Sequence, residues 1–382
     1  MSRLDELIQK LCPNGVEYRK VGDIADYEQP SKYLVKSTNY NDDFATPVLT
    51  AGQTFILGYT NETDGIYPAS KDKPVIIFDD FTGAFKWVDF PFKAKSSAMK
   101  MITAKENVLI RYLYHLMGFL NYSSDDHKRL WISTYSEFKF PVPPLEVQRE
   151  IVRILDNFTL LTAELTAELT ARKKQYEFYR DDLLTFESDI PLLPIKEVVK
   201  KSCAGATPAK GNSEYYKGGT IPWIRTQDVR FNEITEVDSF ITEKAVEETA
   251  TKWIPENCVI VAISGATAGR CAINKIKATT NQHCLNMQID AEKALYKYVY
   301  YCICSKQDEL ISKKQGARGD LNSSLILGTK IPVPKLEIQK KIVHVLDNFE
   351  AICTDLNIGL PAEIEARQKQ YEYYRDKLLS FE

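Results

Sequence analysis

Basic and amide side chains gather in segments predicted to be loops, and these are the residues of this chain that could do chemistry. Arg and Lys grip phosphates, and Arg, Lys, Asn and Gln read the edges of base pairs. For any single residue of this kind, an ordinary solvated loop is the alternative interpretation. The candidate nucleic-acid contacts are Lys93, Lys95, Ser97, Lys100, Lys128, Arg129, Lys210, Asn212, Arg225, Gln227, Arg230, Arg270 and Arg318.

Sequence signatures of enzymes are missing. There is no GxxxxGK[ST] phosphate loop, no GxGxxG turn, no GxSxG nucleophile elbow and no Asn-Pro-Pro-aromatic motif. A magnesium-dependent nuclease would need clustered carboxylates with a lysine, and Asp79-Asp80 lies 57 residues before Glu137-Phe-Lys139. The four His and eight Cys residues lack the spacing of a zinc site. We therefore predict no catalytic residue, no metal and no cofactor on this chain.

The composition is that of a folded protein with more than one domain. The chain has 382 residues, a net charge of −3 and 44% apolar residues. Its longest apolar runs are far shorter than the roughly 18 residues that a membrane span requires. No signal-peptide pattern is present, so we expect a cytoplasmic protein with reduced thiols.

An internal repeat organises the sequence. Residues 141–158 (PVPPLEVQREIVRILDNF) match residues 332–349 (PVPKLEIQKKIVHVLDNF) at twelve of eighteen positions, with an offset of 191. Residues 172–187 match residues 367–382 at twelve of sixteen positions, with an offset of 195. The second copy thus carries four extra residues between its two blocks. The order is variable region, repeat, variable region, repeat.

Each repeat predicts a long helix with a single apolar seam. In the first copy the heptad spacing runs unbroken from Ile151 to Leu183, and a helix from Leu145 to Phe186 would be roughly 63 Å long. The four extra residues of the second copy form a stutter, and with Gly359 and Pro361 they predict a break there. The predicted seam consists of Ile151, Leu155, Phe158, Leu165, Leu169, Tyr176, Tyr179, Leu183, Ile342, Leu346, Phe349, Leu356, Tyr371, Tyr374 and Leu378.

The first copy contains the run TAEL-TAEL-TA at residues 162–171. Each TAEL unit adds about 6 Å to a helix, so the run is either a plain spacer or a ruler. Two such helices would most simply pack on each other. The intervening domain leaves parallel and antiparallel pairing open, and a homodimer through the seams is a further possibility.

The variable regions read as two α+β domains, each ending in a helical stretch. Residues 1–139 contain 17 basic and 18 acidic residues, whereas residues 188–330 contain 19 and 16. Acidic residues are therefore concentrated on the long helices. A coiled-coil adaptor with protein-binding domains and a stand-alone nuclease or methyltransferase remain the alternatives to a DNA-binding protein.

Together the two copies of PVPxLExQxxIVxxLDNF and QYExYRDxLLxFE resemble the specificity subunit of Type I restriction–modification systems. The segments GATPAKGNSEYYKGGTIPWIRTQDV and ISGATAGRCAINKIKATTNQ are similar to target-recognition domains of that family. The resemblance implies an α+β fold with two recognition domains, separated by two long helices packed as an antiparallel coiled coil with a pseudo-twofold repeat. It assigns residues 1–140 and 188–331 to the recognition domains, and 141–187 and 332–382 to the helices.

The same resemblance implies a non-catalytic subunit that reads a split target in double-stranded DNA, one half-site per recognition domain. The long helices would set the half-site separation and dock two methylation subunits, through which restriction subunits join. S-adenosylmethionine, ATP and Mg²⁺ would then reside on those partners.

Overall fold

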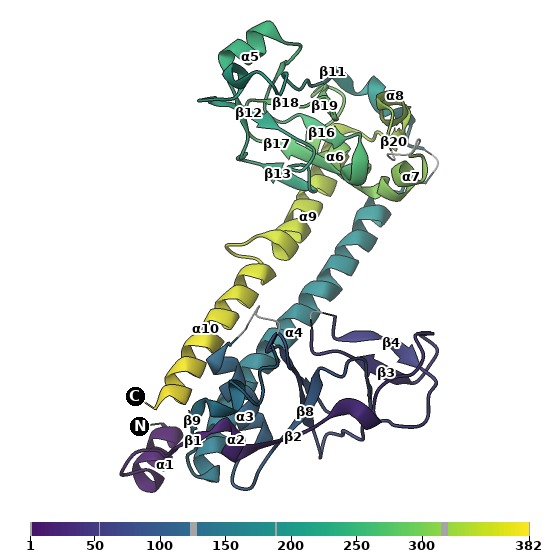
Figure 1. Cartoon of the computed structure of the whole chain (residues 1–382). Helices are drawn as coiled ribbons and strands as arrows, with labels where there is room; N and C mark the ends of the chain where they lie inside the picture. The colour runs from purple at the N-terminus through teal and green to yellow at the C-terminus, as the bar shows by residue number, and fades with distance from the viewer. Residues whose placement is uncertain (1, 53, 123–127, 188, 315–319, 382) are drawn as a thin grey trace. The chain divides into compact units, whose positions relative to one another are not determined.

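The computed structural model describes residues 2–52, 54–122, 128–187, 189–314 and 320–381 (Figure 1). The chain forms two compact units. Unit 1 comprises Met1–Thr166 and Glu363–Glu382, and unit 2 comprises Ala167–Ala362. Each unit therefore contains one variable region and part of both repeats. Among the described residues, no helix is long and apolar enough to cross a membrane.

Unit 1 contains a four-stranded antiparallel sheet, a three-stranded sheet and a two-stranded ribbon. The four-stranded order is β2-β8-β5-β6, the three-stranded order is β4-β3-β7, and β1 pairs with β9. The strands are β1 (Tyr18–Lys20), β2 (Ala25–Glu28), β3 (Thr46–Leu49), β4 (Ile56–Thr60), β5 (Val75–Asp79), β6 (Phe85–Val88), β7 (Lys93–Ala94), β8 (Met99–Ala104) and β9 (Lys139–Pro141). The short helices are α1 (Arg3–Leu11), α2 (Val21–Ile24) and α3 (Ile110–Leu120).

Strand β5 lies between two apolar cores, which explains its uninterrupted apolar sequence. Ile76 and Phe78 point into the core that contains α3, whereas Val75 and Ile77 point into the core shared with β3. All four side chains are fully buried. The sheet is therefore covered on both faces, and α3 is the layer between it and the long helix.

Unit 2 repeats this plan with a five-stranded sheet, β11-β19-β16-β17-β13, and a four-stranded sheet, β14-β12-β18-β15. Strand β10 pairs with β20 as β1 pairs with β9. The strands are β10 (Leu192–Pro194), β11 (Val199–Ala204), β12 (Ile221–Ile224), β13 (Asn232–Ile234), β14 (Phe240–Ile241), β15 (Trp253–Ile254), β16 (Val259–Ala262), β17 (Cys271–Asn274), β18 (Ala278–Thr280), β19 (Cys284–Ile289) and β20 (Lys330–Pro332). The helices are α5 (Glu243–Glu248), α6 (Tyr296–Ser305), α7 (Gln307–Ser312) and α8 (Ser323–Gly328).

The first repeat forms one continuous helix, α4 (Leu145–Leu183), which is 39 residues long. The second repeat forms two helices, α9 (Leu336–Thr354) and α10 (Leu360–Ser380). This confirms the break predicted at Gly359 and Pro361. A Cβ atom on Gly359 would lie 2.6 Å from the carbonyl oxygens of Ala351 and Asp355, so the chain can turn this tightly only with glycine.

The long helices pair antiparallel within each unit. In unit 1, Arg3 of α1 bridges to Glu150, and Leu4 beside it belongs to the same core as Leu379. Further along α4, Phe158 stacks on Tyr374 of α10 with 5.2 Å between the ring centroids. As α4 advances, α10 therefore runs back, and Figure 1 shows the two helices side by side.

In unit 2 the second half of α4 meets α9 in the same antiparallel sense. Tyr179 contacts Phe349 with the ring centroids 5.6 Å apart, and Leu184 lies in one core with Ile342 and Leu346. The predicted α+β fold with an antiparallel pair of long helices is confirmed. One predicted seam residue is wrong: Leu356 is 72% exposed, because the chain leaves α9 at Thr354 and the heptad no longer applies.

A buried glutamine at the start of each repeat holds the recognition domain against the long helix. Gln148 accepts a hydrogen bond from the backbone N–H of Leu109 (2.9 Å) and donates to the carbonyl oxygens of Asn107 and Pro143. This arrangement caps the N-terminus of α3, whose first N–H groups have no intrahelical partner.

Gln339 makes the same three bonds in unit 2. It accepts from the N–H of Leu295 (2.9 Å) and donates to the carbonyl oxygens of Lys293 and Pro334. Both glutamines are fully buried. Each copy of the repeat therefore makes the same three hydrogen bonds to its own unit through this glutamine.

About two turns further along each helix, an aspartate binds the same terminal helix. Asp156 accepts from Nε of Arg111 and contacts Nε2 of His115, each at 2.8 Å. Asp347 accepts from Nζ of Lys297 (2.9 Å) and from the hydroxyl of Tyr301. Burial lowers the pKa of His115, which keeps the imidazole neutral at pH 7.

We expect Gln148→Ala and Gln339→Ala each to lower the free energy of unfolding by about 1–3 kcal/mol, because each leaves a buried N–H and two carbonyl oxygens without a partner. Urea unfolding followed by circular dichroism measures the change. Arg149→Ala, one residue along α4 and exposed, is the matched control and should change stability by less than about 0.5 kcal/mol. Equal stability of Gln148→Ala and the wild type would contradict the docking role of the amide.

Candidate nucleic-acid interface

Two of the lysines predicted to contact nucleic acid lie inside unit 1. Lys93 and Lys100 are each 1% exposed. Nζ of Lys93 lies 2.6 Å from a carboxylate oxygen of Glu62 and donates to the carbonyl oxygen of Asp64. Nζ of Lys100 lies 3.1 Å from Asp80, whose side chain is also 1% exposed. Both lysines are therefore internal ion-pair partners, and the prediction that they contact nucleic acid is wrong for this conformation.

The electrostatics of these pairs follow from their burial. The Lys93 ammonium and the backbone N–H groups of Ser37 and Lys36 lower the pKa of Glu62 to about 2, so this carboxylate is ionised at any physiological pH. A buried ammonium costs several kcal/mol unless it is paired, which is why each lysine has an acid beside it. Spacing along a strand could not reveal this, because the partners lie in other segments.

The remaining unit 1 candidates are exposed. Lys95 and Ser97 lie in the turn before β8, and Lys128 and Arg129 lie before the buried residue Leu130. The hydrogen bond from the N–H of Asp80 to the carbonyl of Ala98 places this turn beside Asp80, and Arg129 reaches Asp80 at 3.8 Å. The two predicted clusters thus belong to one surface, since one is held by the backbone N–H of the buried Asp80 and the other lies beside its carboxylate.

The residues considered for a nuclease centre have structural roles. Asp79 accepts hydrogen bonds from the N–H groups of Phe81 and Thr82 and so closes the turn after β5. Asp80 forms an ion pair with Lys100 at 3.1 Å, and Glu137 forms one with Lys20 at 2.6 Å. Among the described residues, no group of three or more metal-ligating side chains is found.

A cleft in unit 2 brings two predicted candidates together. Lys210 and Arg225 line a hollow of about 570 Å³ with the loop Asn281–His283, from which Gln282 projects. The aromatic residues Tyr216, Trp223 and Phe240 form its walls, with Thr207, Asp238 and Ser239 beside them. Segments about 60 residues apart in sequence meet here because β12 and β18 are parallel neighbours, so both end at the same edge of their sheet.

Hydrogen bonds hold the walls of the cleft and the amide of Gln282, whereas one guanidinium N–H of Arg225 has no partner among the described residues. Trp223 donates its indole N–H to the carbonyl of Ala206 (3.2 Å), and Gln282 bonds Thr207. Nε of Arg225 is buried and has no hydrogen-bond partner among the described residues. An unpaired buried guanidinium N–H is costly in the free protein, so the cleft favours a ligand that can accept a hydrogen bond there.

The other unit 2 candidates do not line this cleft. Asn212 accepts from the N–H of Glu214, and Arg230 donates through Nε to the carbonyl oxygen of Gln227. Arg270 is partly exposed after the turn Gly265–Thr267, and Arg318 lies outside the described residues. Thus Asn212 and Gln227 stabilise local turns, and only Lys210 and Arg225 share the cleft.

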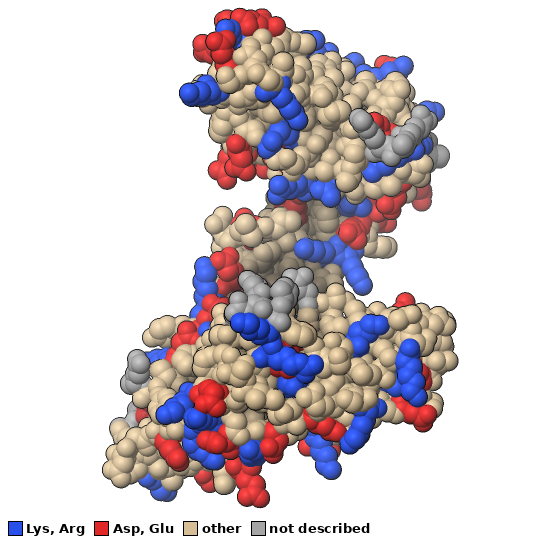
Figure 2. Space-filling view, in the orientation of Figure 1, with Lys and Arg blue, Asp and Glu red and all other residues tan. Residues whose placement is uncertain are grey.

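Charge is dispersed over the surface. Figure 2 shows Lys and Arg side chains scattered over the visible face of each unit, with Asp and Glu among them. In unit 2 one group of acidic side chains lies at the end that carries α5, and others lie elsewhere on this face. A continuous basic stripe is not visible on this face. The residues that line the cleft are therefore better evidence for a binding site than the net charge is.

Comparison with known proteins places the chain in a family. Residues 13–172 and 188–366 each match the Type I restriction modification DNA specificity domain. The chain is a member of the Type I specificity subunit family. It is 46% identical, over its whole length and 98% of the relative, to the EcoR124I/EcoR124II specificity subunit of Escherichia coli.

Solved structures of specificity subunits share the fold. One comes from the M. genitalium restriction–modification system, with a TM-score of 0.57, 12% identity and coverage of 96% of this chain and 97% of that one. Another, from work on complex assembly and conformational transition of a type I system, gives a TM-score of 0.61 and 17% identity, covering 96% and 98%. Specificity subunits recognise DNA and are not catalytic, so the stand-alone enzyme and the protein-binding adaptor are both wrong. Membership also means assembly with other restriction–modification subunits and with DNA.

Sequence reasoning missed part of the cleft of this specificity subunit. Asn281, Gln282 and His283 were not among the candidates, although amide and imidazole side chains in one short loop are typical of base contacts. Their position directly after the buried strand β18 is the signal that could have identified them. Phe240 and Asp238, from a different turn, could be found only in three dimensions.

Mutation can distinguish a buried, ion-paired lysine of unit 1 from an exposed lysine that is a candidate DNA contact. We expect Lys100→Met to lower the free energy of unfolding by about 3–5 kcal/mol, since it removes the buried ammonium that lies 3.1 Å from the buried Asp80 carboxylate. Lys95→Met, five residues earlier and exposed, should leave stability within about 0.5 kcal/mol of the wild type and weaken duplex binding. Thermal unfolding and a gel shift measure the two effects, and the reverse pattern would restore Lys100 as a DNA contact.

Proposed function

We propose that this specificity subunit reads a split DNA target, with one half-site bound by each recognition domain and unread base pairs between them. The observation that carries the proposal is that both domains are docked onto the long helices by equivalent residues, a buried glutamine and a partly exposed aspartate. Two readers with a common attachment are the arrangement that an asymmetric, two-part target requires.

The cleft of unit 2 has the chemistry of a base-reading surface. Arg225 can donate two hydrogen bonds to the O6 and N7 atoms of guanine, and the amide of Gln282 suits adenine. Lys210 at the same cleft suits a phosphate, which adds affinity without sequence preference. The exposed unit 1 residues Lys95, Ser97, Lys128 and Arg129 are the corresponding candidates for the other half-site.

In each unit the long helices expose a surface suited to partner subunits. Large apolar side chains on them are exposed in the described structure, and such side chains mark protein interfaces. They are Leu160, Leu161, Phe178, Ile352 and Tyr373, with exposures of 58%, 44%, 66%, 44% and 62%. We assign this surface to two methylation subunits, which would bring S-adenosylmethionine, and through them to restriction subunits that use ATP and Mg²⁺, all in the cytoplasm.

Arg225 provides a direct test of base reading. With the target identified by mapping methylated adenines in the complete complex, Arg225→Ala should weaken binding to the target duplex by about 1–3 kcal/mol and relax the choice of base at one position of one half-site. Fluorescence anisotropy on duplexes that differ at single positions measures both effects.

Two matched variants accompany that measurement. Lys210→Ala should weaken binding to all duplexes alike and reduce the dependence of log K on log salt by about one unit. Lys200→Ala, exposed on β11 and outside the cleft, should bind as the wild type does. If Arg225→Ala left affinity and base choice intact, the cleft would not be the reading surface.

The continuous helix α4 predicts how the half-sites are spaced. One further TAEL unit after Leu169 adds about 6 Å to a helix beside a duplex that rises about 3.4 Å per base pair, so the unread spacer should lengthen by roughly one to two base pairs. Sequencing of methylated sites before and after the insertion measures the spacer. An unchanged spacer would mean that α4 is not the ruler.

A further inference from the structure

The strands that form the cleft of unit 2 have counterparts in unit 1. The cleft lies where the parallel strands β12 and β18 end, and β14 pairs with β12 on its other side. In unit 1, β3 and β7 are also parallel, and β4 pairs with β3 on its other side. The strand orders β14-β12-β18 and β4-β3-β7 are therefore the same. The edge at which β3 and β7 end is thus the unit 1 equivalent of the cleft.

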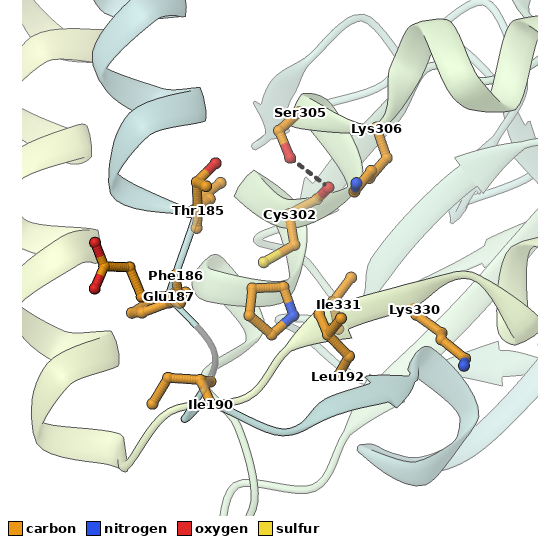
Figure 3. Close-up of a pocket in the computed structure, with 12 residues that line it drawn as sticks. Thr185, Phe186, Glu187, Ile190, Leu192, Cys302, Ser305, Lys306, Lys330 and Ile331 are labelled. Carbon is orange, nitrogen blue, oxygen red and sulfur yellow. Dashed lines mark hydrogen bonds between the residues drawn. The ribbon is translucent and has the colours of Figure 1, made fainter.

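The hollow beside the end of α4, which Figure 3 shows, has a different chemistry. Core side chains form its walls, among them Leu184, Cys302 and Ile331. The hydroxyl of Ser305 donates to the carbonyl oxygen of Cys302 at 2.9 Å. The described residues that line this hollow include no Arg, Asn or Gln, the side chains that make bidentate contacts with base edges. The edge of the sheet is therefore the place to look for a second reading site.

Backbone hydrogen bonds show where the equivalent turn begins. The N–H of Asn281 donates to the carbonyl oxygen of Ile224, and the N–H of Lys95 donates to that of Leu49, each at 3.0 Å. Asn281 directly follows β18, and Lys95 directly follows β7. Lys95 thus starts the turn that is equivalent to Asn281–His283.

The turn itself is built in the same way in both units. In Asn281–His283 and Ser96–Ala98, the side chain of the first residue accepts a hydrogen bond from the N–H of the third, at 3.0 and 3.1 Å. The carbonyl oxygen of the third residue accepts from the residue that follows the central strand, β16 or β5. The middle residues, Gln282 and Ser97, are therefore equivalent, and Lys95 is a residue that unit 1 has in addition.

The guanidinium of the unit 2 cleft has no counterpart at the same place in unit 1. Arg225 directly follows β12, and Thr50 directly follows β3. The Thr50 hydroxyl donates to the carbonyl oxygen of Thr54 (2.8 Å) and accepts from the N–H of Gly52 (3.1 Å), so it stabilises its own turn. A basic group that reads bases at this edge of unit 1 therefore has to come from the turn after β7.

Lys95 supplies that basic group, and Tyr40 holds it in place. Lys95 is exposed, and its Nζ lies over the ring of Tyr40, 5.6 Å from the centroid. A cationic side chain in this position is attracted to the aromatic ring. Tyr40 itself is held against β4, because a Cβ atom on Gly58 would lie 2.7 Å from its Cβ and the next N–H, of Asn41, donates to the carbonyl oxygen of Tyr59. The ammonium is therefore oriented and still accessible to a ligand.

Arg129 occupies a position at which the two units differ in charge. The residues that follow Arg129 and Asp320 donate their N–H groups to the same segment, the one after β5 or β16, each at 2.8 Å. Arg129 is thus the equivalent of Asp320, whose carboxylate accepts hydrogen bonds from Ser264 and Gly265. A basic residue here is not common to both units, which narrows the base contacts of unit 1 to the turn after β7.

We propose that Lys95 and Ser97 read the bases of the unit 1 half-site, that Lys95 recognises a guanine, and that Tyr40 is a positioning residue for Lys95. The ammonium can donate to the O6 and N7 atoms of guanine in the major groove, and the Ser97 hydroxyl suits a neighbouring base. The inference rests on the proposed function, since it requires that unit 1 reads a half-site. It goes further by naming the residues and the base.

The test uses the complete complex and the target defined by mapping methylated adenines. Fluorescence anisotropy compares duplexes that differ from the target at single positions in each half-site. We expect Lys95→Ala to reduce the preference for one G·C pair of one half-site from at least about tenfold to less than about twofold, because a base contact is lost. Preferences in the other half-site should be unchanged. Lys95→Arg should keep the preference for guanine, because a guanidinium can make the same pair of contacts.

Variants of Tyr40 distinguish the positioning role from a role in folding. Tyr40→Leu removes the ring and should lower the preference for the same G·C pair about two- to fivefold, because the ammonium is no longer oriented. Tyr40→Phe, the conservative variant, keeps the ring and should retain the preference that Tyr40→Leu loses. Thermal unfolding verifies that both variants are folded, and if Tyr40→Leu is not, the Lys95 variants still decide the identity of the reading residue.

Lys71→Ala is the matched control, because Lys71 is exposed and lies before β5, at the opposite end of that strand from Asp79. It should bind every duplex as the wild type does. Equal weakening of all duplexes by Lys95→Ala would assign this lysine to a phosphate and overturn the proposal. A loss of base preference in Arg129→Ala that Lys95→Ala does not show would also overturn it. A wild-type complex without preference in either half-site would instead contradict the proposed function.

Discussion

The attachment of each recognition domain to a long helix depends on one buried side-chain amide. Gln148 and Gln339 satisfy the first N–H of the domain's terminal helix and two carbonyl oxygens at once, with no exposure to water. A buried amide bonded on both sides tolerates little displacement, because each lost bond leaves a desolvated polar group. The orientation of the domain on its helix is therefore set by directional contacts, and the surrounding apolar core supplies the bulk of the stability.

The same attachment shows how a repeat can be shared between unlike domains. Asp156 and Asp347 are equivalent in sequence, yet the first binds Arg111 and His115 and the second binds Lys297 and Tyr301. A carboxylate accepts hydrogen bonds from any of these donors, so the repeat can stay constant while the docked helix changes. This separates the part of the specificity subunit that assembles from the part that varies with the DNA target.

Burial, more than the type of residue, distinguishes the candidates that can contact DNA from those that cannot. Lys93 and Lys100 lie near the exposed Lys95 in sequence, but their side chains point inward to carboxylates on other segments. Lys93 and Lys100 belong to β7 and β8, whereas Lys95 lies in the turn between these strands, so a cluster of lysines in the sequence is divided between core and surface. In unit 2, residues that are far apart in sequence come together instead. Parallel pairing of β12 and β18 brings Arg225 and Gln282 into one cleft.

The sequence alone determined the repeat, the long helices, the break at Gly359 and the family, because these depend on periodicity and identity along the chain. The tertiary structure alone decided which residues of the long helices meet, which lysines are buried, and that Asn281–His283 belong with Arg225. Contacts between segments far apart in sequence carry no periodic signal, so only the folded chain reveals them.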